Sequence, residues 1–114
     1  MIQIYHNQRC GKSRNCLAIL TEKEEAIEVV EYLESPPSKN DLYGLLQKLN
    51  FKPIQLVRVK ETIWIENYKN KSLTDEGIIQ AMVEHPILIE RPIVIKGNQA
   101  IIGRIPEEVI RFLK

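Results

Sequence analysis

The sequence has few cysteines, few aromatic residues and almost no net charge. Two cysteines among 114 residues are too few for a disulfide framework. The sequence shows neither a charged leader followed by an apolar core nor a long hydrophobic run, so it indicates neither export nor membrane insertion, and we expect a cytoplasmic protein. A formal net charge of +1 does not favour nucleic acid or an anionic membrane surface as a partner, so any anion specificity must be local.

The length and the 44% hydrophobic content predict one globular domain over residues 1–114. Apolar runs over residues 1–5 and 26–33 are typical of strands, and apolar residues at helical spacing over 13–20 predict a helix between them. The first third of the chain is therefore expected to form a β-α-β unit with a right-handed crossover.

Helical patterns fill the middle of the chain, about residues 38–86. Ser38 with Asp41 is typical of a helix start, and Thr74 is a candidate N-cap before another apolar helical pattern. This segment is expected to be an all-helical insertion.

Two apolar runs over residues 92–95 and 100–103 are joined by a short polar segment that predicts a β-hairpin, and residues 106–113 predict a last helix. The order β-α-β, helices, β-β-α is that of an α/β thioredoxin-like fold with a four-stranded mixed sheet and a helical insertion between its halves.

A polar turn after the first predicted strand ends at Cys10 and opens the first predicted helix. Backbone N–H groups at a helix N-terminus lack intrahelical partners and the helix dipole is positive there, so a thiolate is favoured and an oxyanion can be bound. Cys10 is therefore the candidate nucleophile, able to attack an electron-poor oxyanion centre and form a covalent thiol ester. His6 lies four residues upstream and either adds positive charge or shapes the turn.

Four separated segments resemble the glutaredoxin-coupled arsenate reductase (ArsC) family. They are Ile4-Tyr5-His6-Asn7 with Cys10-Gly11 and Ser13-Arg14-Asn15, then Tyr32-Leu33-Glu34-Ser35-Pro36-Pro37-Ser38, then His85-Pro86-Ile87-Leu88-Ile89-Glu90-Arg91-Pro92-Ile93-Val94, and Gly103-Arg104 before Pro106-Glu107. The resemblance covers nearly the whole chain and implies a thioredoxin-like fold and the reduction of arsenate to arsenite. It also implies glutathione as a cosubstrate, glutaredoxin as a partner and no bound cofactor.

The resemblance assigns roles to several further residues. It implies that His6 tunes the Cys10 thiolate and that three arginines, Arg58, Arg91 and Arg104, bind the oxyanion. A guanidinium suits this role because it stays charged and forms bidentate hydrogen bonds with tetrahedral oxyanions. The resemblance further implies a cis peptide bond at Pro92, facing the nucleophile.

Ser13 and Asn15 lie on the first turn of the predicted helix, where their side chains either bond the thiolate or the anion or simply cap the helix. On a helix, Cys16 lies about 9 Å along the axis and about 240° around it from Cys10, beyond the reach of a disulfide. Cys16 is therefore expected to be a packing residue. The resolving thiol is expected to come from outside the chain, and the resemblance suggests glutathione, with glutaredoxin reducing the mixed disulfide.

Several other classes of protein fit less well. A phosphatase-like Cys-x5-Arg loop is excluded because Cys16 stands where the arginine would be, and a Cys-x-x-Cys enzyme or Spx-type regulator would need a cysteine in place of Ser13. A zinc site built from His6, Cys10, Cys16 and His85 has no recognisable ligand spacing, so no metal is expected. The hypotheses are a monothiol arsenate reductase, a glutathione-dependent oxidoreductase of another substrate, and a regulator that binds RNA polymerase or another protein through the sheet edge or the insertion.

Overall fold

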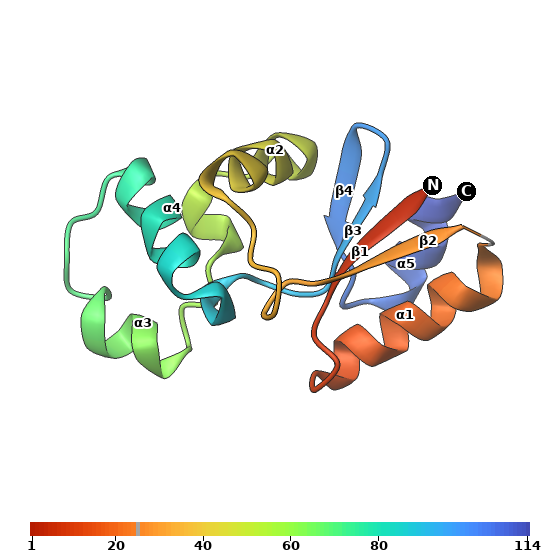
Figure 1. The fold of residues 1–114 in the computed structure, drawn as a ribbon, viewed down its shortest axis with the longest axis horizontal. Coiled ribbons are helices and arrows are strands. Elements are labelled where there is room, and N and C mark those ends of the chain that lie inside the picture. Colours follow the sequence, from red (N-terminus) through yellow and green to blue (C-terminus); the bar gives the residue numbers. More distant parts are fainter. Residues whose placement is uncertain (25) are drawn as a thin grey trace. The chain divides into compact units, whose positions relative to one another are not determined.

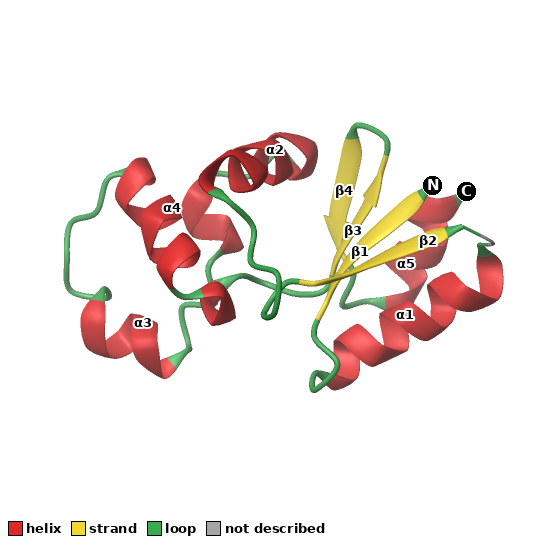
Figure 2. Cartoon of the chain, in the orientation of Figure 1, coloured by secondary structure: helices red, strands yellow, loops and turns green. Residues whose placement is uncertain are grey.

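The computed structural model describes residues 1–24 and 26–114. The chain forms two compact units, one of Met1–Ser35 with Arg91–Lys114 and the other of Pro36–Glu90 (Figure 1). Within the described residues the first unit carries the sheet and the second is helical (Figure 2). The single domain over residues 1–114 stays a prediction.

The first unit is built on a four-stranded sheet with strand order β2-β1-β3-β4. Its strands are β1 (Ile2–His6), β2 (Ile27–Glu31), β3 (Ile93–Lys96) and β4 (Gln99–Ile102). β1 pairs in parallel with β2 and antiparallel with β3, which pairs antiparallel with β4. The predicted β-α-β and β-β-α halves of a mixed sheet are confirmed.

Two helices, α1 (Gly11–Lys23) and α5 (Pro106–Leu113), contact each other and the strands of this unit. Because side chains alternate along a strand, one face of the sheet supplies apolar residues to both helices. The buried cluster between them consists of Ile2, Ile4, Cys16, Leu20, Val94 and Val109.

Two elements differ by more than one residue at an end from what the sequence pattern predicts. α1 begins at Gly11 and continues to Lys23, so it is longer at both ends than the predicted 13–20. β2 is shorter than 26–33, because the carbonyl oxygen of Glu31 accepts hydrogen bonds from the N–H groups of Glu34 and Ser35 at 3.0 and 2.8 Å. A backbone carbonyl that closes a turn is no longer available to a neighbouring strand.

The second unit contains α2 (Lys39–Leu49), α3 (Thr62–Asn67) and α4 (Asp75–Glu84), with short 3-10 turns at Pro53–Leu56 and Pro86–Leu88. The predicted helix starts are confirmed. The Ser38 hydroxyl accepts the Asp41 N–H at 3.1 Å while the Asp41 carboxylate accepts the Ser38 N–H at 3.0 Å, and the Thr74 hydroxyl accepts the Gly77 N–H at 3.1 Å. No helix in the described part of the chain is long and apolar enough to cross a membrane.

Gly103 lies directly against the core of the first unit. A Cβ atom at this position would be 2.8 Å from Cys16 Sγ, 3.1 Å from Val94 Cγ2 and 3.3 Å from Val109 Cγ2. These distances are shorter than van der Waals contact, so the close approach of this backbone to α1 and α5 requires glycine.

Gly103→Ala is expected to lower the free energy of unfolding by about 1–3 kcal/mol, because the added methyl overpacks the core. Gly44 is the matched control: it lies inside α2 with no atom within 4 Å of its added Cβ, so Gly44→Ala is expected to raise stability by about 0.5–1 kcal/mol. Urea denaturation of both variants measures the difference. Equal stability of Gly103→Ala and the parent chain would contradict the close packing described above.

Candidate active site

Cys10 is the N-cap residue of α1, and it is partly exposed. Its backbone is held on both sides: the Cys10 N–H donates to the Asn7 carbonyl at 3.0 Å, and the Cys10 carbonyl accepts the Arg14 N–H at 3.0 Å. Cys10 thus directly precedes the first helical turn, whose N–H groups lack intrahelical partners, and this is the position expected from the sequence; its side chain makes no capping hydrogen bond. A thiolate or an oxyanion at this position faces the positive end of the helix dipole.

The Ser13 hydroxyl ties the loop before Cys10 to the helix after it. Ser13 is fully buried, and its Oγ accepts the Asn7 N–H at 3.0 Å and lies 2.6 Å from His6 Nδ1. Either the hydroxyl donates to Nδ1 or the protonated Nδ1 donates to the hydroxyl. In both cases Ser13 bonds the histidine and the loop backbone, and this arrangement serves to position Cys10.

The same loop has two further supports. The Asn7 carboxamide Oδ1 accepts the Arg9 N–H at 2.9 Å, and the Arg14 guanidinium donates from Nη1 to the Gln8 carbonyl at 3.0 Å. Asn7 is buried and was missed as a site residue by the reasoning from sequence. Its signal was available, because asparagine at the start of a polar turn commonly bonds the backbone two residues on.

A small pocket of about 190 Å³ opens beside this loop. Its lining residues are His6, Asn7, Gln8, Arg9, Glu31, Leu33 and Glu34. His6 and Glu31 are neighbours in the register of β1 and β2. The pocket therefore has both basic and acidic side chains in its lining, next to the loop that carries the candidate nucleophile. Asn15, in contrast, lies exposed on α1.

Cys16 is buried, whereas Cys10 is partly exposed. Cys16 is 1% exposed, and burial raises the pKa of its thiol from 9.0 to about 12. It lies inside the continuous helix α1 and belongs to the apolar cluster of the first unit. The expectation that Cys16 is a packing residue is confirmed.

Arg91 and Arg104 lie together in the first unit. The Arg104 guanidinium donates from Nη1 to the Arg91 carbonyl at 3.1 Å, and the Gly103 N–H donates to the Pro92 carbonyl at 2.8 Å. The Arg91–Pro92 peptide bond is cis, as the resemblance implies. The structure thus places the Arg104 guanidinium against the backbone of Arg91.

Arg58 belongs to the second unit, where it pairs with two carboxylates. Its Nη1 lies 2.5 Å from Glu61 Oε1 and its Nε lies 3.7 Å from Glu90 Oε1. That Arg58 joins Arg91 and Arg104 on one oxyanion stays a prediction. The two carboxylates were not identified from the sequence, although Glu61 stands at the i+3 spacing that favours such a pair.

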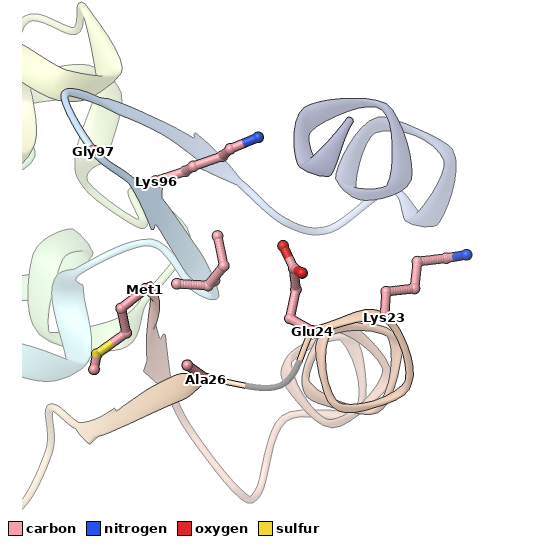
Figure 3. Close-up of a pocket in the computed structure, with 7 residues that line it drawn as sticks. Met1, Lys23, Glu24, Ala26, Lys96 and Gly97 are labelled. Atoms are coloured by element: carbon pink, nitrogen blue, oxygen red, sulfur yellow. The ribbon is translucent and has the colours of Figure 1, made fainter.

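A larger pocket, of about 550 Å³, lies at the N-terminal end of β1, whereas Cys10 follows its C-terminal end. Figure 3 shows the residues that line this pocket. Its lining residues are Met1, Ile2, Lys23, Glu24, Ala26, Lys96 and Gly97. The Lys96 side chain points toward α5, where its Nζ donates to the Leu113 carbonyl at 3.2 Å. None of the candidate site residues lines this pocket, so its size alone does not make it the active site. Among residues 1–24 and 26–114, no group of three or more histidine, cysteine or acidic side chains is placed to hold a metal ion.

A mixed sheet with a cysteine at the N-terminus of the first helix and a cis-proline before the third strand defines a thioredoxin-like protein with one candidate redox cysteine. A family model described as the ArsC family matches residues 5–112. The chain belongs to the ArsC family.

Its relatives cover almost the same length. The chain is 45% identical over 114 residues to the uncharacterized protein YfgD of Escherichia coli K12, with 98% of this chain and 96% of the relative covered. It is 40% identical over 112 residues to the arsenate reductase of Haemophilus influenzae, with 96% and 97% covered. The solved arsenate reductase from Vibrio cholerae has a TM-score of 0.90 and 43% identity, with 96% of this chain and 95% of that chain covered.

In the native protein, iodoacetamide at about pH 8 is expected to alkylate Cys10 and to leave Cys16 unmodified, because only an exposed thiolate reacts. Mass spectrometry should find one adduct on the native chain and two on the chain unfolded in urea. Cys10→Ser is the control and should take up no label while folded. Labelling of Cys16 in the native chain at a rate similar to that of Cys10 would contradict the assignment.

Proposed function

We propose that this chain reduces arsenate, or a similar oxyanion, by a monothiol mechanism with Cys10 as the nucleophile. The observation that carries the proposal is the placement of Cys10, partly exposed at the N-terminus of α1 on a loop held by Ser13 and Arg14. Membership of the ArsC family, several of whose members are named arsenate reductases, gives the substrate class.

The first proposed step forms a bond between Cys10 Sγ and arsenic. The thiolate attacks arsenate, an oxygen leaves as hydroxide and is protonated to water, and a Cys10 thiol ester of As(V) remains. The N–H groups at the start of α1 stabilise the negative charge on the arsenate oxygens during the attack. This step changes no oxidation state.

The second proposed step transfers two electrons. A glutathione thiolate attacks Cys10 Sγ, the S–As bond breaks, and its electron pair stays on arsenic, which leaves as arsenite. Cys10 is left in a mixed disulfide with glutathione. A glutaredoxin thiolate then attacks the glutathione sulfur and releases the Cys10 thiolate. The sum is one oxyanion reduced for two thiols oxidised, with no bound cofactor.

The need for an outside thiol has a structural reason in this chain. Cys16 is the other cysteine, and it is buried in the apolar cluster on a continuous helix. To reach Cys10 it would have to leave the core and unwind α1, which would cost far more than the use of a thiol in solution. The structure therefore supports a monothiol reaction resolved by a second molecule.

The remaining roles follow the chemistry of each side chain. We assign oxyanion binding to Arg58, Arg91 and Arg104, because guanidinium groups match the geometry and charge of arsenate. His6, bonded to Ser13, is assigned to the tuning of the Cys10 thiolate. Pro92, directly before β3, and Asn15, on α1, are assigned to the shape of the site and support it without reacting.

The test is consumption of NADPH in a mixture of arsenate, glutathione, glutathione reductase and glutaredoxin. Cys10→Ser is expected to lower turnover by about three orders of magnitude or more, because a serine hydroxyl is not ionised at neutral pH. Cys16→Ala is the matched control, since it removes the other sulfur and should keep most of the turnover.

Turnover that survives in Cys10→Ser would overturn the proposal. Absence of arsenate turnover in the parent chain, with a glutathione disulfide nevertheless formed at Cys10, would overturn arsenate as the substrate and retain the thiol chemistry. Such a result would direct the search to another substrate of a glutathione-dependent reaction.

A further inference from the structure

The second unit holds Arg58 in a defined position beside two acidic residues. An isolated antiparallel bridge pairs Val57 with Ile89, and next to it the Arg58 N–H donates to the Leu88 carbonyl at 2.7 Å. This pairing places Arg58 beside the chain segment that continues to Glu90. This backbone pairing therefore fixes the position from which the Arg58 side chain extends.

The second carboxylate comes from the turn that follows Arg58. The Glu61 N–H donates to the Arg58 carbonyl at 3.0 Å, and Glu61 is the N-cap residue of α3. This turn brings the Glu61 carboxylate onto the Arg58 guanidinium, at 2.5 Å from Nη1. Glu90 contacts a different nitrogen of the guanidinium, Nε, at 3.7 Å.

The charges around Arg58 do not favour an anion as they stand. One guanidinium faces two carboxylates, and the nearer of them, Glu61, is hydrogen-bonded to Nη1. Their side chains are only 25% to 26% exposed, and water screens such charges less than it screens charges on an open surface. An anion that approaches Arg58 would be repelled by the two carboxylates and would find one N–H of Nη1 already bonded to Glu61.

We propose that Glu61 is an internal competitor of the oxyanion for Arg58. The oxyanion binds by replacing the Glu61 carboxylate at Nη1, while Glu90 keeps its contact at Nε and orients the guanidinium. Glu61 therefore lowers the affinity for the oxyanion and helps to set the substrate concentration at which the protein works. This inference rests on the proposed function through the assignment of Arg58 to the oxyanion.

Glu61 rather than Glu90 is the competitor because of where each carboxylate lies. Bidentate recognition of an oxyanion uses neighbouring N–H groups of the guanidinium, and Nη1 is one of its two terminal nitrogens. Glu61 occupies Nη1 at hydrogen-bond distance, whereas the contact of Glu90 with Nε is longer than a hydrogen bond.

The proposal is tested with Glu61→Gln, which keeps the size of the side chain and removes its charge. In the coupled assay the KM for arsenate is expected to fall about threefold to tenfold, with kcat within about twofold of the parent value, as for the loss of a partly exposed ion pair. Glu66→Gln is the matched control, because Glu66 is exposed on the same helix α3 and loses the same charge. Its KM should equal that of the parent chain.

Two further experiments distinguish an effect of Glu61 on arsenate binding through Arg58 from an effect on the chemical step or on charge in general. Calorimetric titration of arsenate into Cys10→Ser forms of the chain, with and without Glu61→Gln, measures binding without chemistry. In an Arg58→Ala background, Glu61→Gln should no longer change arsenate affinity, because its effect passes through the guanidinium. Thermal unfolding of each variant checks that the fold is retained.

The outcomes are distinct. An unchanged or higher KM and dissociation constant in Glu61→Gln would overturn the inference, and so would an equal gain in Glu66→Gln, a gain that persists without Arg58, or a failure of arsenate to bind any of the proteins. Tighter binding in Glu61→Gln together with no turnover in the parent chain would overturn the proposed function and retain the inference.

Discussion

The buried Ser13 hydroxyl joins the end of β1 to the first turn of α1, and the position of Cys10 depends on that join. Asn7 and His6 are bonded to the same oxygen, so the loop cannot move away from the helix without leaving polar groups in the core unpaired. The Arg14 side chain adds a second connection to the loop. A nucleophile at a helix N-terminus is useful only if its backbone stays there, and these bonds keep it there.

The two cysteines show how the fold separates a reactive thiol from an inert one. Cys10 is the N-cap residue of α1, at the helix end with unpaired N–H groups. Cys16 lies within α1 and packs in the apolar cluster next to Gly103. The helix dipole favours a charged sulfur at the first site, and burial disfavours one at the second. The chain therefore offers one thiol to a substrate, and the proposed reaction takes its second thiol from glutathione.

Much of the fold could be predicted because the sequence patterns that indicate it involve residues close together in the chain. The Ser38–Asp41 capping box, the Thr74 cap and the strand patterns on either side of Gly97 each depend on a few adjacent residues. The partners of Ser13 and the carboxylates of Arg58 could not be predicted to the same degree. Ser13 was expected to bond the thiolate, the anion or the helix end, and its hydroxyl bonds His6 and the Asn7 N–H, because the end of β1 lies beside the first turn of α1. Glu90 lies near Arg58 because the antiparallel bridge between Val57 and Ile89 pairs two segments that are distant in the sequence.

An oxyanion that binds next to the Cys10 thiol should protect it from alkylation, and this protection is the most direct test of the proposed function. The rate of Cys10 alkylation by iodoacetamide should be measured on the native chain over a range of arsenate concentrations in the absence of glutathione. The account predicts a rate that falls with arsenate and reaches a plateau, because a bound or covalently attached oxyanion blocks the sulfur. A rate that is independent of arsenate at every concentration would contradict it.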